Sequence, residues 1–160
     1  MTPRAQAPSI DILVQSPLWN EQPAAEDTVR GAIAAAAAAA SNAKDGEVSV
    51  VLTDDAAIRA LNKQWRKVDK PTNVLSFPAT QGGSMLGDIV IAYETLQREC
   101  TEEDRVFLHH LAHLSVHGFL HLMGYDHETD AEADSMERLE TAVLQQLGLP
   151  DPYLGRDLRD

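Results

Sequence analysis

Residues 117–127 read HGFLHLMGYDH and hold three of the six histidines of this 160-residue chain. On a helix, His117 and His121 are one turn apart, so both imidazoles lie on one face and can reach the same ion. Gly124 can take the left-handed conformation that ends a helix and reverses the chain. Such a turn brings His127 back toward the other two. The stretch therefore predicts a helix that ends near Gly124 and a metal site built from three histidines.

All six histidines lie between His109 and His127, and the cluster has other interpretations. A histidine-rich helix can act as a pH sensor, and a lone buried histidine is usually a satisfied core residue. His113 is about 12 Å along the helix axis from His121, too far for both to bind one ion. If His127 is not the third ligand, Asp126 or His113 takes that place. Three imidazoles favour zinc or a similar metal and leave a fourth position for water, which is typical of catalytic sites.

The spacing of the three histidines and the glycine equals that of the metzincin peptidase motif H-E-x-x-H-x-x-G-x-x-H. Gly118 stands where that motif has its general-base glutamate. This difference argues against a peptidase, which is kept as the less favoured alternative.

Outward from the histidine stretch, β-branched segments such as EVSVVL at 47–52 alternate with helical ones. Strands are expected at 9–14, 47–53, 73–77 and 85–92. Helices are expected at 26–44, at 55–68, at 94–99, from a capping box at 101–104 to near Met123, and at 129–147. These elements predict an α+β fold, a small mixed sheet covered by helices. Without a linker or repeat, residues 1–160 are expected to form a single domain whose ends, 1–8 and 151–160, are mobile.

Single residues refine this expectation. The helix at 55–68 places Ile58, Leu61 and Trp65 on one apolar face. Seven alanines follow Ile33, and we interpret them as a closely packed helix. Cys100 is the only cysteine, which excludes an internal disulfide and a cysteine-rich zinc site, and we expect it to serve packing.

Composition narrows the class of protein. Asp and Glu number 25 against 13 Lys and Arg, giving a net charge of −12, and 44% of residues are hydrophobic. The longest aliphatic run, 32–40, is far shorter than the roughly 20 residues of a membrane span. The first residues are too broken by proline and charge for a secretory signal. We therefore expect a cytoplasmic protein without a membrane partner.

The acidic total argues against nucleic-acid binding by bulk charge, but the basic residues are unevenly placed. Five of the 13 lie between positions 59 and 70, where Asp69 is the only acid: Arg59, Lys63, Arg66, Lys67 and Lys70. Arg66 is at the centre, and its guanidinium can hold two phosphate oxygens. The alternative is an ordinary solvated helix end, where basic residues are favoured.

These motifs resemble those of one known family. The histidine stretch, preceded by AHL at 112–114, is nearly a signature of the YbeY family of bacterial rRNA maturation factors. Residues 61–66 (LNKQWR) and 69–78 (DKPTNVLSFP) resemble its L-N-x-x-[YW]-R…P-T-[DN]-V-L-S-F-P pattern, and LGDIVI at 86–91 resembles its L-G-D-I-x-I strand. Ser76 and Asp88 match this pattern, but their spacing assigns them no role. The resemblance covers about residues 48–140.

The resemblance implies a zincin-like sheet with the metal helix alongside it. It also implies one zinc ion per chain, held by His117, His121 and His127, with Arg66 as the catalytic arginine. The implied activity is single-strand-specific cleavage of RNA in 16S rRNA 3′-end maturation and ribosome quality control. The small ribosomal subunit and assembly factors would be partners. A noncatalytic ribosome-assembly factor whose metal only holds the fold together is the other alternative.

Four further residues are given candidate roles from their chemical types. Lys63, Lys67 and Lys70 are candidate RNA contacts beside Arg66. Asp126 is a candidate to orient His127 or a metal-bound water, and equally a plain turn aspartate.

Overall fold

The computed structural model describes residues 8–40, 46–79 and 83–153. The described strands form one mixed sheet in the order β1-β2-β4-β3. Their bounds are Ser9–Val14 for β1, Glu47–Thr53 for β2, Val74–Pro78 for β3 and Met85–Ala92 for β4. β1, β2 and β4 run parallel, and β3 pairs antiparallel with β4 and forms one edge. The predicted strands are confirmed, with β3 one residue later than expected.

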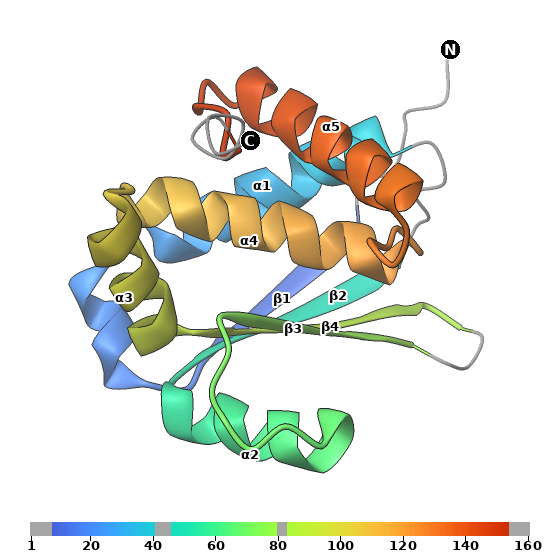
Figure 1. The fold of residues 1–160 in the computed structure, drawn as a ribbon. Coiled ribbons are helices and arrows are strands. Elements are labelled where there is room, and N and C mark those ends of the chain that lie inside the picture. Colours follow the sequence, from blue (N-terminus) through green and yellow to red (C-terminus); the bar gives the residue numbers. More distant parts are fainter. Residues whose placement is uncertain (1–7, 41–45, 80–82, 154–160) are drawn as a thin grey trace.

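Helices cover both faces of this sheet. Their bounds are Ala25–Ala39 for α1, Asp55–Arg66 for α2, Tyr93–Glu103 for α3, Phe107–Leu122 for α4 and Asp130–Gln146 for α5, and a 3-10 helix, η1, spans Pro17–Glu21. Figure 1 shows α1 and α4 on one face, α5 outside them and α2 on the opposite face. The predicted α+β architecture is confirmed.

The core lies mainly between the sheet and the α1–α4 layer. In β2, Val48, Val50 and Leu52 alternate with less buried residues, as expected for a strand with one covered face. In α1, Ala32 and Ala36 are fully buried, and alanine allows the close helix contact that the alanine run predicts. α4 is therefore held tightly between α1, the sheet and α5.

The capping box expected at 101–104 is wrong. Residues 101–103 are the last turn of α3, where Thr101 Oγ1 donates to the Gln97 carbonyl at 3.1 Å. Asp104 is left-handed, with φ of 54°, and α4 starts at Phe107 without a side-chain cap. A threonine followed by acids fits the exposed end of one helix as well as the start of the next. The observed capping box is Thr129 with Glu132, at the start of α5.

Two other helix predictions differ at their ends. α2 ends at Arg66, two residues early, because Lys67 takes a left-handed conformation with φ of 63°. α1 ends at Ala39, and residues 41–44 of its expected span lie outside the described residues.

The apolar face predicted for α2 is only partly covered. Ile58 is buried and Leu61 half-buried, but the Trp65 ring is 61% exposed. Its aromatic neighbour is Phe77, with ring centroids 6.3 Å apart. Phe77 belongs to β3, the edge of the sheet, so no further strand is available to cover the indole.

Most of both terminal segments expected to be mobile lies outside the described residues, at 1–7 and 154–160. Pro8 is buried, and the Tyr153 hydroxyl donates to Glu140 of α5. Cys100 is buried as expected, and burial raises the pKa of its thiol to about 11. No described helix is both long and apolar enough to span a membrane.

Candidate metal centre and cleft

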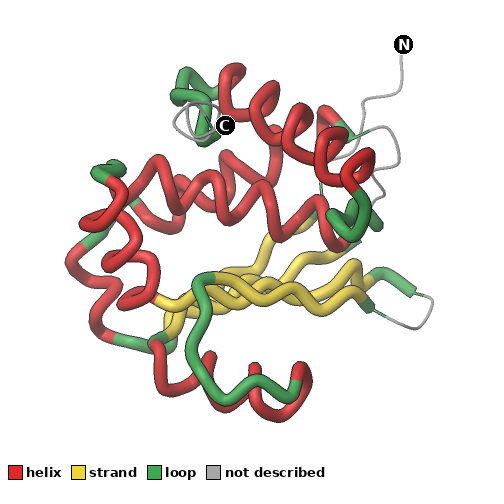
Figure 2. The backbone as a smooth tube through the Cα atoms, in the orientation of Figure 1, coloured by secondary structure: helices red, strands yellow, loops and turns green. Residues whose placement is uncertain are grey.

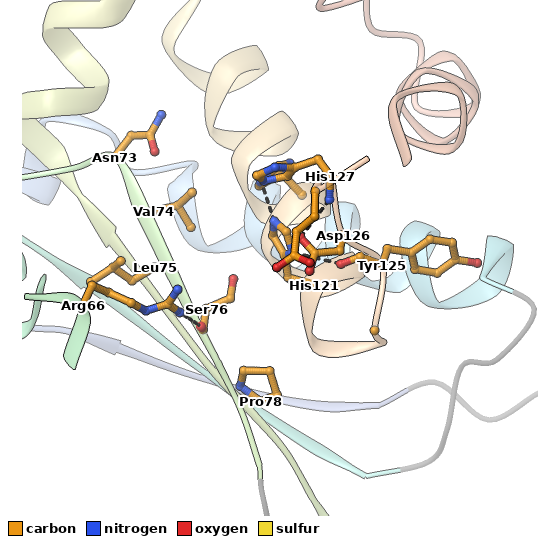
Figure 3. A pocket seen from close by; sticks show the side chains of 13 residues that line it. Arg66, Asn73, Val74, Leu75, Ser76, Pro78, His121, Tyr125, Asp126 and His127 are labelled. Carbon is orange, nitrogen blue, oxygen red and sulfur yellow. Dashed lines mark hydrogen bonds between the residues drawn. The ribbon is translucent and has the colours of Figure 1, made fainter. Parts of the chain in front are cut away.

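Three histidines converge at the end of α4, as the sequence predicts. His117 and His121 lie one turn apart on α4, and His127 follows the turn at Gly124. Gly124 is left-handed, with φ of 95°, and the Tyr125 N–H donates to the Leu120 carbonyl at 3.0 Å. This turn returns the chain to the helix. One ring nitrogen from each of the three histidines, hereafter the histidine triad, lies within 4.8 Å of the other two. Figure 3 shows His127 above His121 at the cleft.

Hydrogen bonds set which ring nitrogen of each helical histidine faces the cleft. His117 Nδ1 lies 2.5 Å from Glu140 Oε2, and His121 Nδ1 lies 2.9 Å from the Tyr125 carbonyl. An ionised carboxylate and a carbonyl only accept, so both Nδ1 atoms carry the proton. In neutral rings, both Nε2 atoms then present lone pairs, the state that a metal requires.

The donor set fits a transition metal. His117 Nε2 and His121 Nε2 face each other at 3.1 Å. Two lone pairs at that distance repel unless a proton or a cation lies between them. In tetrahedral zinc with bonds of about 2.1 Å, two nitrogens are about 3.4 Å apart, close to the observed separation. The two helical histidines therefore have the orientation and spacing of transition-metal ligands, and His127 brings a third ring nitrogen within 4.8 Å of theirs.

Glu140 is the residue of this site that the sequence interpretation missed. Its side chain is fully buried, although it is charged. It lies on the same α5 stripe as the buried Met136, Val143 and Leu144. An acid on an otherwise apolar helix face was the available signal, because buried charges are retained when they have partners.

The partners of Glu140 form a buried network behind the metal ligands. His117 bonds to one carboxylate oxygen, and His113 and Tyr153 bond to the other. Burial raises the pKa of Glu140, but the hydrogen bonds and charges of His113 and His117 outweigh it and lower the pKa to about 2. Glu140 is therefore an anion at neutral pH. His113 serves this network and is not one of the converging triad.

Burial, together with the charge of His117, lowers the pKa of His121. The Tyr125 carbonyl opposes this shift, as does the charge of Asp126. The net direction keeps His121 neutral to lower pH than a free imidazole, which favours metal binding.

The triad forms one wall of a cleft of about 460 Å³, and the edge strand β3 forms the other. Arg66 lines this cleft from the end of α2. Its Nη2 donates to the Ser76 carbonyl at 2.8 Å, and its Cζ lies 5.6 Å from the centre of the Phe77 ring. Figure 2 shows the loop that rises from α2 to the start of β3 and so connects these two elements. The histidine triad, a candidate metal site, therefore lies across the cleft from the Arg66 guanidinium.

Of the other predicted site residues, one lines the cleft and three do not. Asp126 lines the cleft, and its Oδ1 accepts the His127 backbone N–H at 2.8 Å, a contact that shapes the turn. Lys63, Lys67 and Lys70 are exposed and do not line the cleft. Of the predicted basic residues, only Arg66 faces the triad.

Close packing explains the glycine in the histidine motif. A Cβ at Gly118 would lie 2.9 Å from Ile89 Cγ2 and 3.2 Å from Ser76 Oγ. The Gly118 carbonyl accepts the Ser76 hydroxyl at 3.2 Å, so α4 lies directly against the sheet here. A glutamate at this position would have to displace buried β4.

The fold and cleft define a class of protein: an α+β chain with a three-histidine metal-type centre opposite an arginine. The family described as "Endoribonuclease YbeY" matches residues 15–148. A protein named Endoribonuclease YbeY from Bradyrhizobium sp. strain BTAi1 is 53% identical, over 99% of each chain. One of the same name from Nitrobacter winogradskyi is 54% identical, over 94% of this chain and 84% of its own. The chain belongs to the YbeY endoribonuclease family.

A solved structure is also similar. The solution structure of TM1509 from Thermotoga maritima is 27% identical and has a TM-score of 0.50. The match covers 86% of this chain and 91% of TM1509.

Proposed function

We propose that this chain is a zinc-dependent endoribonuclease that cleaves single-stranded RNA during 16S rRNA 3′-end maturation and ribosome quality control. Family membership supports RNA cleavage. The observation that carries the proposal is the cleft itself, where the histidine triad and Arg66 face one another. One zinc ion per chain is the expected cofactor.

His117, His121 and His127 would hold the zinc ion. When bound there, zinc supplies Lewis-acid chemistry, which polarises a phosphoryl oxygen and lowers the pKa of water. Glu140 and the Tyr125 carbonyl keep two of the rings in the orientation that presents Nε2. The carboxylate therefore acts as a positioning group and never touches the substrate.

Arg66 would bind the scissile phosphate. The Ser76 carbonyl uses one of its five N–H donors and holds the guanidinium at the cleft. In the reaction, a water or ribose hydroxyl loses its proton and forms a new P–O bond, while the bond from phosphorus to the leaving ribose oxygen breaks and that oxygen takes up a proton. Negative charge increases on the phosphoryl oxygens as this bond forms, and the guanidinium stabilises it.

The cleft favours single-stranded RNA. Its volume of about 460 Å³ is within the range of pockets that take small ligands. Bases of single strands can be splayed into such a cleft, whereas duplex bases are stacked and paired. The small ribosomal subunit and its assembly factors are the proposed partners, and the cytoplasm is the proposed location.

Turnover of labelled single-stranded RNA by Arg66→Ala tests the proposal. Loss of one transition-state charge contact lowers the rate roughly 10²- to 10³-fold, while metal content and folding stay intact. Arg66→Lys should keep part of the activity, because an ammonium cannot hold two oxygens as a guanidinium does. Arg59→Ala is the matched control, since Arg59 lies on the same helix but pairs with Asp69.

The alternatives give different results in the same assay. Equal RNA cleavage by wild type, Arg66→Ala and His117→Ala would identify a contaminating nuclease and favour a noncatalytic assembly factor. Cleavage of casein that is lost in His121→Ala would favour a metallopeptidase. The tight packing at Gly118, where a peptidase has its general base, supports the nuclease.

A further inference from the structure

The C-terminal end of α2 carries an exposed aromatic ring that the proposed chemistry does not use. Trp65 is 61% exposed, the highest value among the large hydrophobic side chains that the structure describes. The chain's other tryptophan, Trp19, is buried and donates its indole N–H to the Thr53 carbonyl at 2.9 Å. Trp19 is thus part of the core, whereas much of the Trp65 indole is open to a ligand.

Phe77 links this ring to Arg66, which lines the cleft. The Trp65 ring meets Phe77 edge-on, with centroids 6.3 Å apart and planes at 63°. The Arg66 guanidinium lies over the same Phe77 ring at 5.6 Å. The indole therefore lies beside Arg66 on the α2 side of edge strand β3, and neither Trp65 nor Phe77 is among the residues that line the cleft.

Charge around the ring favours a polyanion. Lys63, Lys67 and Lys70 are all exposed near Trp65 in the chain. Asp69, the acid among them, is paired with Arg59 at 2.8 Å. Lys67 Nζ has a long contact of 3.5 Å to the Gln64 carbonyl, which leaves its ammonium two further donors. In a chain of net charge −12, this end of α2 is a local cationic surface.

We propose that Trp65 is a stacking platform for a base of single-stranded RNA that leaves the cleft past Arg66, with the nearby lysines contacting its phosphates. Aromatic rings with neighbouring cations are the general means of holding single strands, because every base has a face that can stack. The proposal rests on the proposed function and extends it from the scissile phosphate to a flanking nucleotide. Duplex RNA lacks a free base for this surface.

Binding of a cleavage-resistant 2′-O-methyl oligoadenylate to the full-length protein tests the platform. Trp65→Leu keeps an apolar contact with Phe77 but has no ring, and binding should weaken roughly 5- to 150-fold, the loss of one stacked base. Trp65→Phe should lie between this variant and wild type. Leu13→Ala is the control, since Leu13 is a 52% exposed side chain on β1.

Fluorescence separates stacking from charge attraction. The oligoadenylate should quench the emission of Trp65, whereas an abasic backbone of equal length should not. In Trp65→Phe only the buried Trp19 remains, and quenching should vanish. Lys67→Gln should weaken binding of both ligands equally and reduce the salt dependence by about one ion.

Two results would overturn the platform: oligoadenylate binding by Trp65→Leu within twofold of wild type, or equal quenching by the abasic backbone. Either one would assign the exposed ring to a protein partner instead. The outcome is independent of cleavage. An inactive wild type with a working platform would contradict the proposed function alone, and active cleavage without quenching would contradict the platform alone.

Discussion

Replacing the buried carboxylate behind the metal site should weaken zinc binding without removing a ligand. Glu140 accepts His117 Nδ1–H on one oxygen and contacts His113 and Tyr153 through the other. In Glu140→Gln, one carboxylate oxygen becomes an NH₂ group. This NH₂ donor then faces another donor: His117 Nδ1–H on one side, or the His113 and Tyr153 donors on the other. The substitution therefore removes a charge-assisted hydrogen bond inside a dry core.

The expected magnitude follows from that bond. A buried hydrogen bond to a charged group contributes about 1.5–3 kcal/mol, which corresponds to roughly 10- to 100-fold in an equilibrium constant. Partners that orient metal-ligating histidines usually contribute the same range to metal affinity. We expect the zinc dissociation constant of Glu140→Gln to rise roughly 10- to 100-fold. Glu140→Asp should lose less, because the charge remains.

Competition with a chromophoric chelator measures this constant. Asp134→Asn, an exposed acid on the same helix, is the matched control for the change in charge. Thermal unfolding of the metal-free proteins separates affinity from stability. If folded Glu140→Gln bound zinc within twofold of wild type, the hydrogen bond from His117 to the carboxylate would have no part in positioning the ring for the metal.

Three further perturbations have defined outcomes. Alanine at any one residue of the histidine triad should reduce zinc below one ion per chain by elemental analysis, and unchanged zinc in His127→Ala would give that position to another ligand. Burial raises the pKa of Glu99, but hydrogen bonds from His110 and Asn73 outweigh it and lower the pKa. Its stabilising contribution is thus complete above pH 4.5 and lost as the pH falls further, so Glu99→Gln should flatten the acid limb of denaturant-measured stability; an unchanged limb would contradict this. Gly118→Ala should lower the free energy of unfolding by about 1 kcal/mol, because overpacking costs about 1–3 kcal/mol and helix propensity returns up to about 1; a stabilised variant would show that the helix can shift.

Much of the fold could be predicted because its signals are local. β-branched runs fix β1, β2 and β4, and the alanine run fixes α1. The convergence of the triad was also predictable, since one helical turn and one glycine turn lie within 11 residues. Local patterns of this kind predict helices, strands and turns without knowledge of the tertiary structure.

The errors arise where tertiary packing chooses between equivalent local patterns. The residues at 101–104 fit a helix start in isolation, but they extend α3 in the fold. Trp65 continues an apolar stripe, yet the sheet ends at β3 and leaves it exposed. Glu140 is 23 residues from His117, and only the packing of α5 on α4 brings them together.

The hydrogen bonds that orient the triad have a consequence for the coupling of metal binding to folding. They involve the core of α5 and the backbone of the turn, so contacts within the protein itself orient the rings of His117 and His121. In a zinc finger the metal must organise the chain, and the unliganded state is unfolded. Here the conformational entropy of the ligands is lost during folding, before any ion arrives. Zinc should therefore bind to and dissociate from a protein that is already folded. A chelator should remove the ion while the helices remain intact.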